Sequence, residues 1–485
     1  MAALLAERKR WAMRSNLDNI QGMLLMDRGF FQGKRVLIMG LGRFGGGLDS
    51  ALFAAKAGAE VCVTDLADET ELADSFRKLK DCDIRFRLGE HREDDFKQAQ
   101  ILIVNPAVPP DNQYIQMTRK AGGLITSQME LFFQLCPAHI IGITGANGKS
   151  TTTSLTAHLL KSGCGQEGVG YDNVFLGGNI GHQPLLDSVD DIKENDIVVL
   201  EISNFQLEQL ARIQASPDIA LITNLTANHL DRHGIFEAYC RAKEGIFQYQ
   251  NPDAEAPVVS IFNAEDPITH DWHQKYSNDP QRKCLTFNAD DVPDEYAAVF
   301  GLPGRVNRSN LAAALAIVSC FSINQKRIKA AIQSFEGLPN RCELIAETNG
   351  VRWYDDSKAT TPASTIAALN ALETKRGQTP FIVLIAGGYD KQISFAELGI
   401  CIAHRAKAAV LIGQTAPKIV EAIKAIDDSD CVIKYADSME QAVQVARKLT
   451  TSGDAVLMSP ACASYDMFKN YTQRSAAFIQ AVKAL

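Results

Sequence analysis

The stretch "GITGANGKSTTT", from Gly142 to Thr153, constrains the fold more than any other feature of the sequence. An apolar, β-branched run precedes it and an amphipathic run follows it, so the pattern predicts a strand, a glycine-rich turn and a helix. Backbone N–H groups in such a turn, at a helix N-terminus, bind anions. Lys149 adds a mobile cation, and Ser150 adds a hydroxyl that suits a metal ion. The general phosphate-loop pattern needs glycine where Ile143 stands, so the stretch predicts phosphate binding without defining the reaction.

Strand-like and helix-like runs alternate from Val36 to the end of the chain, which is typical of parallel α/β architecture. At 485 residues, the chain is long enough for two to four domains. We predict three domains after an N-terminal extension, because three segments each begin with a new strand. The predicted segments are the extension at 1–32, a Rossmann-like domain at 33–127, a central domain with a P-loop-type parallel sheet at 128–337, and a Rossmann-like C-terminal domain at 338–485.

The composition of the chain indicates which kinds of binding partner are disfavoured. The net charge of -8 disfavours nucleic acid or anionic lipid as a general partner. No run of about 18 apolar residues occurs, so the sequence predicts no membrane span. The eleven cysteines are scattered singly, which is typical of reduced thiols in a reducing compartment. We therefore expect a cytoplasmic protein that binds small molecules and neither nucleic acid nor a membrane.

The first domain carries a dinucleotide-fold fingerprint. A predicted strand at 36–39 leads into Gly40, Gly42 and Gly45, and a second strand at 61–64 ends at Asp65. Glycines at this spacing admit a diphosphate, and the acid holds a ribose hydroxyl. The pattern is not specific for NAD. A glycine-rich turn that only lets the helix pack on the strand is the alternative.

Polar residues also follow the strands of the central domain. Glu201 ends the apolar run "IVVL", and His229 lies in a loop after the run "IALIT". A carboxylate and an imidazole in the same sheet as Ser150 favour magnesium or manganese ligation, although His229 alone would be read as a surface or loop histidine. Lys243 falls in a predicted helix, where the pattern alone predicts a solvated lysine.

Three polar loops follow strands of the C-terminal domain. They are "YDDSKATTPAST", "AGGYDK" and "SPACASYDMFKNYTQR". Loops at the same ends of parallel strands meet at one edge of a sheet. Lysine, serine and threonine suit carboxylates, so this edge is predicted to receive an anionic amino acid. An exposed, charged turn is the alternative for the first loop.

Together these strings resemble the Mur ligases, ATP-dependent enzymes that form amide bonds in peptidoglycan synthesis. The resemblance rests on "GLGRFG", "GITGANGKST", "GGNIG", "LEISNFQLE", "HLDRH", "GLPNRCE", "WYDDSKAT", "GGYDK" and "SPACASYDMFKNY". They occur in the family's order and span residues 33 to 485. The strings "DSKAT" and "SPACAS" are more specific to the branch that adds D-glutamate to UDP-N-acetylmuramoyl-L-alanine.

The resemblance implies ATP and Mg²⁺ as cofactors and a role for each matching position. The implied ATP-binding residues are Gly145, Ala146, Asn147, Gly148, Lys149, Ser150, Thr151, Asn307, Asn310, Arg341 and Asp356. The implied residues for the uridine-diphosphate substrate are Gly42, Arg43, Phe44, Asp65, Asn179 and Ser203. The implied D-glutamate-binding residues are Lys358, Thr360, Lys391, Ser464 and Tyr471. The implied catalytic residues are Lys149, Glu201, His229 and Lys243, and the implied metal ligands are Ser150, Glu201, His229 and a carbamylated Lys243.

The implied reaction converts the substrate carboxylate into an acyl phosphate, which the amine of D-glutamate then attacks. We expect the protein to be a monomer. Several positions depart from the family pattern, among them Asn228, Asn340 and Asp355, where the family usually has Asp, His and Asn. These departures leave open a related ligase with another acid or amino acid as substrate. A non-catalytic nucleotide-binding protein and a dehydrogenase are the remaining alternatives, and the second phosphate-binding loop disfavours the dehydrogenase.

Overall fold

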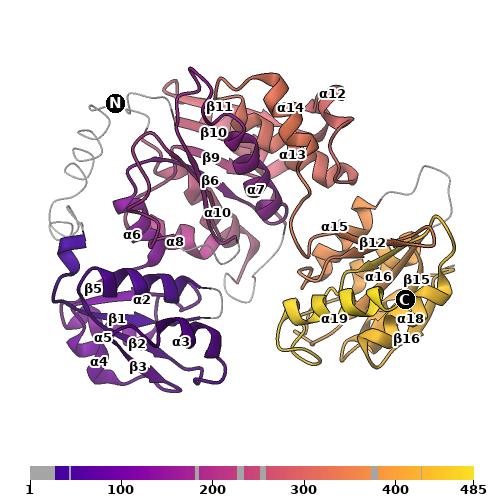
Figure 1. The fold of residues 1–485 in the computed structure, drawn as a ribbon, viewed down its shortest axis with the longest axis horizontal. Coiled ribbons are helices and arrows are strands. Elements are labelled where there is room, and N and C mark those ends of the chain that lie inside the picture. Colours follow the sequence, from indigo (N-terminus) through magenta and orange to yellow (C-terminus); the bar gives the residue numbers. More distant parts are fainter. Residues whose placement is uncertain are drawn as a thin grey trace. The chain divides into compact units, whose positions relative to one another are not determined.

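A computed structural model describes residues 28–42, 45–180, 185–226, 234–251, 258–372, 381–427 and 429–485. These residues form three sheets with helices packed against them (Figure 1). The described residues up to Asn288, together with Ala313–Ala331, make one compact unit, and Ala289–Ala312 with Ile332–Leu485 make the other. The predicted three-domain α/β class is confirmed. The boundaries predicted at 33, 128 and 338 stay predictions.

The first sheet is parallel and has the strand order β3-β2-β1-β4-β5. Its strands are β1 (Arg35–Met39), β2 (Glu60–Asp65), β3 (Ile84–Leu88), β4 (Ile101–Val104) and β5 (Leu124–Thr126). The accompanying helices are α2 (Gly46–Lys56), α3 (Ala73–Leu79), α4 (Glu93–Gln98), α5 (Gln113–Lys120) and α6 (Gln128–Leu135). The strand order reverses between β1 and β4, and open α/β sheets bind ligands beyond the carboxyl ends of their strands at such a point.

The second sheet is also parallel, with the order β11-β10-β9-β6-β8-β7. Its strands are β6 (His139–Thr144), β7 (Val174–Gly178), β8 (Ile197–Glu201), β9 (Ile219–Ile222), β10 (Val258–Asn263) and β11 (Arg282–Phe287). Its helices include α7 (Lys149–Lys161), α8 (Asn204–Arg212), α10 (Phe236–Gln248) and α11 (Pro267–Tyr276). Strand β6 lies between β8 and β9, so residues that follow these three strands meet at one edge.

A buried carboxylate joins the first two sheets within their common unit. Asp49 on α2 is 3% exposed and accepts hydrogen bonds from the backbone N–H groups of Leu185, Leu186 and Asp187, at 2.9, 2.8 and 3.0 Å. A second polar contact is the ion pair between the buried Glu130 and Arg212, at 2.6 Å. Directional bonds of this kind fix the orientation of α2 against the segment that follows β7 more tightly than apolar packing alone.

The third sheet is mixed and has the order β12-β13-β17-β14-β15-β16. Its strands are β12 (Glu343–Thr348), β13 (Val351–Asp355), β14 (Ile382–Gly387), β15 (Ala406–Ile412), β16 (Val432–Tyr435) and β17 (Ala455–Met458). Only the β12–β13 pair is antiparallel among its described pairs, and the sequence pattern did not predict this edge hairpin. The two residues after Thr348, Asn349 and Gly350, both have positive φ and form the turn between the two strands.

Alternate residues of β14 enter two separate cores of the third sheet. Leu384 packs with α15 (Pro362–Ala371), α16 (Ala396–Arg405) and α17 (Ala416–Lys424), whereas Ile385 packs with α18 (Met439–Leu449) and α19 (Tyr471–Lys483). This division follows from the period of two along a strand and shows that both faces of the sheet are covered. Three more helices, α12 (Asp294–Ala297), α13 (Gly304–Val318) and α14 (Gln325–Gln333), lie between the second and third sheets in the sequence.

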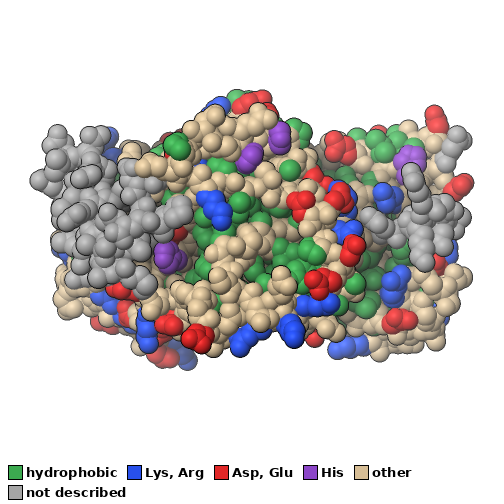
Figure 2. Space-filling model, turned by 90° about the horizontal axis from the view of Figure 1, so that it is seen from above, with side chains coloured by type: hydrophobic (Ala, Val, Ile, Leu, Met, Phe, Trp, Pro, Cys, Tyr) green, Lys and Arg blue, Asp and Glu red, His purple; other side chains and the backbone are tan. Residues whose placement is uncertain are grey.

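Within the described ranges, no helix is both long and apolar enough to cross a membrane. Acidic and basic side chains are interspersed over the face that Figure 2 shows.

Candidate functional site

The glycine-rich turn after β1 is held against the carboxylate at the end of β2. Gly40, Gly42 and Gly45 have φ values of 89, 67 and 93°, a region that other residues rarely adopt. The N–H of Gly42 donates to Asp65 Oδ2 at 3.2 Å. Gly47 at the start of α2 approaches the turn closely, because a Cβ there would lie 2.3 Å from the carbonyl oxygen of Gly40. Arg43 and Phe44 lie outside the described residues.

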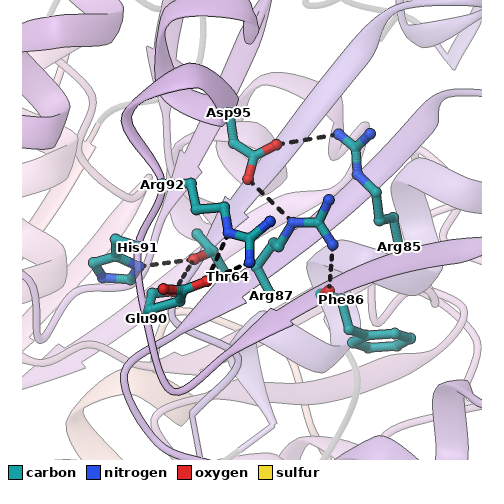
Figure 3. Close-up of polar contacts among 8 residues, drawn as sticks. All are labelled: Thr64, Arg85, Phe86, Arg87, Glu90, His91, Arg92 and Asp95. Carbon is teal, nitrogen blue, oxygen red and sulfur yellow. Dashed lines mark hydrogen bonds and ion pairs between the residues drawn. The ribbon is translucent and has the colours of Figure 1, made fainter.

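A histidine supports this edge from the loop after β3 (Figure 3). His91 Nδ1 lies 2.7 Å from Thr64 Oγ1, and that hydroxyl lies 3.1 Å from the carbonyl oxygen of Glu90. A carbonyl only accepts, so the hydroxyl donates to Glu90 and the Nδ1–H of His91 donates to the hydroxyl. Burial lowers the pKa of His91, and the charge of Asp65 opposes this shift. The sequence pattern gave no signal for His91.

The predicted phosphate loop lies between β6 and α7, as expected. Gly145 has φ 141°, and a Cβ there would lie 2.0 Å from Thr223 Oγ1. The N–H groups of Ala146 and Asn147 donate to the backbone and side-chain oxygens of Asn224, at 2.8 and 2.9 Å. Strand β9 pairs with β6, so Thr223 and Asn224 reach the loop from about 77 residues away, which spacing in the sequence cannot reveal.

Lys149 and Ser150 begin α7. The Nζ of Lys149 donates to the carbonyl oxygens of Gly145 and Ala146, at 3.0 and 2.8 Å, so the cation folds over its own loop. Ser150 is 2% exposed, and Thr151 is buried in the same turn. The loop therefore combines a helix N-terminus, a lysine cation and a hydroxyl at the carboxyl edge of the sheet, an arrangement that suits polyphosphate.

Lys243 is buried beside this loop, so the solvated lysine predicted from the pattern alone is wrong. It lies on α10, is 1% exposed, and donates from Nζ to Thr144 Oγ1 at 3.0 Å. Burial lowers its pKa well below the ordinary value; the positive charge of Lys149 lowers it further, and Glu201 raises it. The sequence did contain a signal for the burial of Lys243, because this residue lies four positions from both Tyr239 and Phe247 on the apolar side of α10.

Glu201 at the end of β8 is a buried carboxylate with one satisfied oxygen. Its Oε1 accepts from Asn179 Nδ2 at 2.9 Å, whereas its Oε2 is buried and has no hydrogen-bond partner among the described residues. An oxygen in this state is costly unless a ligand satisfies it. A hard cation that prefers oxygen ligands fits Glu201 Oε2 and the hydroxyl of Ser150. His229, the remaining predicted ligand, lies outside the described residues, as does Asn228.

Ser203, predicted to contact substrate, has a structural task in the fold. It is the N-cap of α8 and forms a capping box, in which its Oγ accepts from the N–H of Gln206 at 3.3 Å. Asn179, predicted for the same substrate, lies after β7 with its N–H 2.8 Å from the carbonyl oxygen of Glu201. Its contact with Glu201 makes Asn179 a support of the candidate metal site.

The residues predicted for the nucleotide within the second unit come from two regions. Asn307 and Asn310 lie one turn apart on α13; Asn307 Nδ2 donates to the carbonyl oxygen of Pro303 at 2.8 Å. Arg341 precedes β12, and Asp356 follows β13. Asp356 Oδ2 accepts from Ser459 Oγ at 2.7 Å, so it contacts the loop after β17.

The three polar loops of the C-terminal sheet are bonded to one another. The N–H groups of Gly387 and Tyr389 donate to the carbonyl oxygens of Pro460 and Ala463, at 2.8 and 2.9 Å. The guanidinium of Arg474, 1% exposed, donates to the carbonyl oxygens of Cys462 and Ser357, at 3.0 and 2.9 Å. The structure thus brings "DSKAT", "GGYDK" and "SPACAS" together.

A small hollow, with a cavity volume of about 10 Å³, opens among these loops. It is lined by Thr360, Tyr389, Lys391, Ile393, Phe395, Ala461 and Cys462. Lys358 lies with its Nζ 5.9 Å from the ring centre of Tyr471, and Ser464 is 3% exposed in the loop after β17. The residues predicted for D-glutamate therefore come from the same three loops and from the start of α19, and two of them line one hollow.

Three family models match the chain. The MurD-like N-terminal domain of Mur ligases matches residues 34–127, the Mur ligase middle domain matches 143–299, and the glutamate ligase domain of Mur ligases matches 340–462. Among curated proteins, the chain is 38% identical to a UDP-N-acetylmuramoylalanine–D-glutamate ligase of Roseiflexus, over 93% of this chain and 99% of that protein. The corresponding ligase of Acetivibrio thermocellus is also 38% identical, over 93% and 97%.

Solved structures share the fold at lower identity. The UDP-N-acetylmuramate–alanine ligase of Thermotoga maritima aligns with a TM-score of 0.57 and 18% identity, over 93% of this chain and 99% of that one. A MurF ligase of Thermotoga maritima in complex with ADP aligns with a TM-score of 0.54 and 17% identity, over 95% and 97%.

Proposed function

The chain belongs to the Mur ligase family, and we propose that it is the ligase that adds D-glutamate to UDP-N-acetylmuramoyl-L-alanine with hydrolysis of ATP to ADP and phosphate. The observation that carries this proposal is the similarity to curated ligases of that name over 93% of the chain. The geometry supports the same chemistry, because a polyphosphate loop and a loop cluster suited to an anionic amino acid occur in one chain.

The reaction needs an activated acyl donor. The carboxylate of the muramoyl-alanine substrate attacks the γ-phosphorus of ATP and forms an acyl phosphate, with ADP as the leaving group. Lys149 and the N–H groups of the loop are proposed to neutralise charge on the transferring phosphoryl group. The amine of D-glutamate then attacks the acyl carbon, loses a proton and displaces inorganic phosphate. Alignment of the reactants supplies on the order of 7–11 kcal/mol in well-oriented cases.

Glu201, Ser150 and Lys243 are proposed to hold Mg²⁺ together with His229. Magnesium, when bound, would neutralise charge on the β- and γ-phosphates. Lys243 fits this set only if its amine is modified, because an ammonium repels a cation and magnesium prefers oxygen to a neutral amine nitrogen. A neutral, buried amine adds CO₂ to give a carbamate and a proton, and the lowered pKa of Lys243 favours the neutral form.

The amino-acid site is proposed at the hollow of the C-terminal sheet. Lys391 and Thr360 line it, and Lys358, Ser464 and Tyr471 belong to the same group of loops. Lysine cations and hydroxyls there would bind the two carboxylates of D-glutamate. The uridine diphosphate is proposed at the first sheet, near Gly42 and Asp65. We further propose a monomeric enzyme of the cytoplasm.

Release of ADP from ATP tests the function directly. We expect turnover only when both UDP-N-acetylmuramoyl-L-alanine and D-glutamate are present with magnesium. Turnover with L-glutamate or another amine, and none with D-glutamate, would identify a ligase of different specificity. ATP binding without turnover for any substrate pair would contradict enzymatic function.

A further inference from the structure

A fully buried carboxylate connects three segments of the C-terminal unit. Asp355, at the end of β13, is 0% exposed. Its Oδ1 accepts from the N–H and the hydroxyl of Ser357. Its Oδ2 accepts from the side-chain amide of Asn340 at 3.0 Å and from the hydroxyl of Ser475 on α19. Each oxygen thus has two donors, and the buried charge is satisfied by the protein itself.

Asn340 is held through its side chain and through both backbone groups. Its Nδ2 also donates to Ser475 Oγ at 2.8 Å, and its N–H donates to Glu343 Oε2 at 2.9 Å. Its carbonyl oxygen accepts from the N–H of Lys358 at 3.2 Å. The backbone has φ 63°, a left-handed conformation that asparagine adopts more readily than most residues.

This arrangement fixes residues that belong to two substrate sites. Arg341, proposed for the nucleotide, directly follows Asn340, and the N–H of the next residue, Cys342, donates to Asp356 at 3.2 Å. Lys358, proposed for D-glutamate, is held by the carbonyl oxygen of Asn340. We therefore expect a change in the side chain of Asn340 to shift both residues.

We propose that Asn340 and Asp355 form a positioning pair that sets Arg341 for ATP and Lys358 for D-glutamate at the same time. The inference rests on the proposed function, because the two ligands are those of the ligase reaction. Neither member of the pair touches a substrate; each acts through its neighbours. The pair makes the geometry of one site depend on the other.

The hydrogen-bond chemistry of the pair permits a reciprocal test. A carboxylate only accepts, so the amide nitrogen of Asn340 must face Asp355. The variant N340D places two carboxylates against each other in a buried position and loses the donor. In the double variant N340D/D355N, the amide at position 355 donates to the carboxylate at position 340, so the hydrogen bond is restored in the opposite direction. In D355N alone, the amide of Asn340 turns over to accept, so we expect a smaller effect than in N340D.

Steady-state ADP release measures the pair, with ATP and D-glutamate varied in turn. N340G keeps a residue that tolerates φ 63° and removes only the side chain. We expect N340G to raise the KM for both ligands by about tenfold, which corresponds to about 1.4 kcal/mol for each. We expect N340D to raise both further, and N340D/D355N to return both to within about threefold of wild type.

Asn349 provides the matched control. It is an exposed asparagine with φ 52° in the β12–β13 turn, so N349G makes the same chemical change away from both sites. We expect N349G to leave both KM values unchanged. Unchanged KM values in N340G with a lowered Tm, or absence of rescue in N340D/D355N, would overturn the pairing.

Equilibrium ATP binding to the same variants separates this inference from the proposed function. If wild type releases no ADP in response to D-glutamate, the proposed reaction fails, whereas the pair still predicts weaker ATP binding in N340G than in N349G. Equal ATP affinity in those two variants would refute the pair even in an active ligase.

Discussion

Replacement of Asp356 by asparagine should remove a pH dependence from the stability of the C-terminal unit. Asp356 is 7% exposed, and its two oxygens accept from Ser459 Oγ at 2.7 Å and from the N–H of Cys342 at 3.2 Å. Burial raises the pKa of Asp356 from 3.8 to about 7, although the Ser459 hydrogen bond and the charge of Arg341 act in the opposite direction.

The sign follows from the direction of this shift. A folded pKa above the unfolded value means that the folded state binds the proton more tightly. The stabilisation from this group is therefore complete below about pH 4 and is lost as the pH rises to about 7. A rise from 3.8 to about 7 corresponds to about 4 kcal/mol, and residual structure in the unfolded chain reduces the amount measured, so we expect about 2–4 kcal/mol.

Urea denaturation at pH values from 4.5 to 8, in steps of about half a pH unit, measures the pH-dependent contribution of Asp356 to stability. Trp353 is fully buried in β13 and reports on the C-terminal unit. Replacement of Trp11 and Trp272 by Phe in both proteins leaves it as the fluorophore. The free energy of unfolding of wild type, minus that of Asp356→Asn, should fall by about 2–4 kcal/mol over this range.

Asp290 is the matched control in the same unit. It is an exposed aspartate whose pKa is lowered by its hydrogen bond with Arg305, so its contribution is lost as the pH falls. The difference between wild type and Asp290→Asn should therefore be flat or rise with pH. A flat or rising difference for Asp356→Asn as well would refute the assignment of a raised pKa to that carboxyl.

Three further substitutions test the first unit. Gly145→Ala forces φ 141° on a side chain and places its Cβ 2.0 Å from Thr223 Oγ1, so kcat/KM for ATP should fall by about 100-fold, and unchanged kinetics would contradict the loop geometry. Lys243→Ala should remove most turnover, with partial rescue by bicarbonate or a short carboxylate; a wild-type rate would refute its role. Asp49→Ala leaves the N–H groups of 185–187 without their acceptor and should lower the free energy of unfolding by about 3 kcal/mol. Asp49→Asn should lower it by less, and an equal decrease in both variants would argue against a stabilising role for these hydrogen bonds.

Local sequence patterns predicted the strands that are followed by candidate functional residues. The strands before Asp65 and Glu201 occur where apolar runs predict them, because a strand buried on both faces reads as a continuous apolar run. The phosphate loop could be predicted because glycine, lysine and serine act at fixed spacing within one turn. By contrast, β3 and β12 carry charges along the strand, and this patterning hid both edge strands.

Residues that support the sites from a distance could not be predicted. Asn224 holds the phosphate loop only because β9 pairs with β6. Two departures from the family pattern, Asn340 and Asp355, contact each other across 15 positions. The sequence shows them as separate substitutions, whereas the structure shows a donor and an acceptor that fit together.

The charges around Lys243 would link a carbamate on its amine to a bound cation. Burial and the charge of Lys149 lower the pKa of Lys243, which favours the neutral amine that reacts with CO₂. The resulting carbamate would be a second buried anion near Glu201, whose Oε2 has no hydrogen-bond partner in the part of the chain that the structure describes. Two buried anions without a cation are costly, and a divalent cation without the second anion is held by fewer charged ligands. Carbamylation of Lys243 and binding of the cation would therefore stabilise each other, so we expect retention of the carbamate on Lys243 to require magnesium.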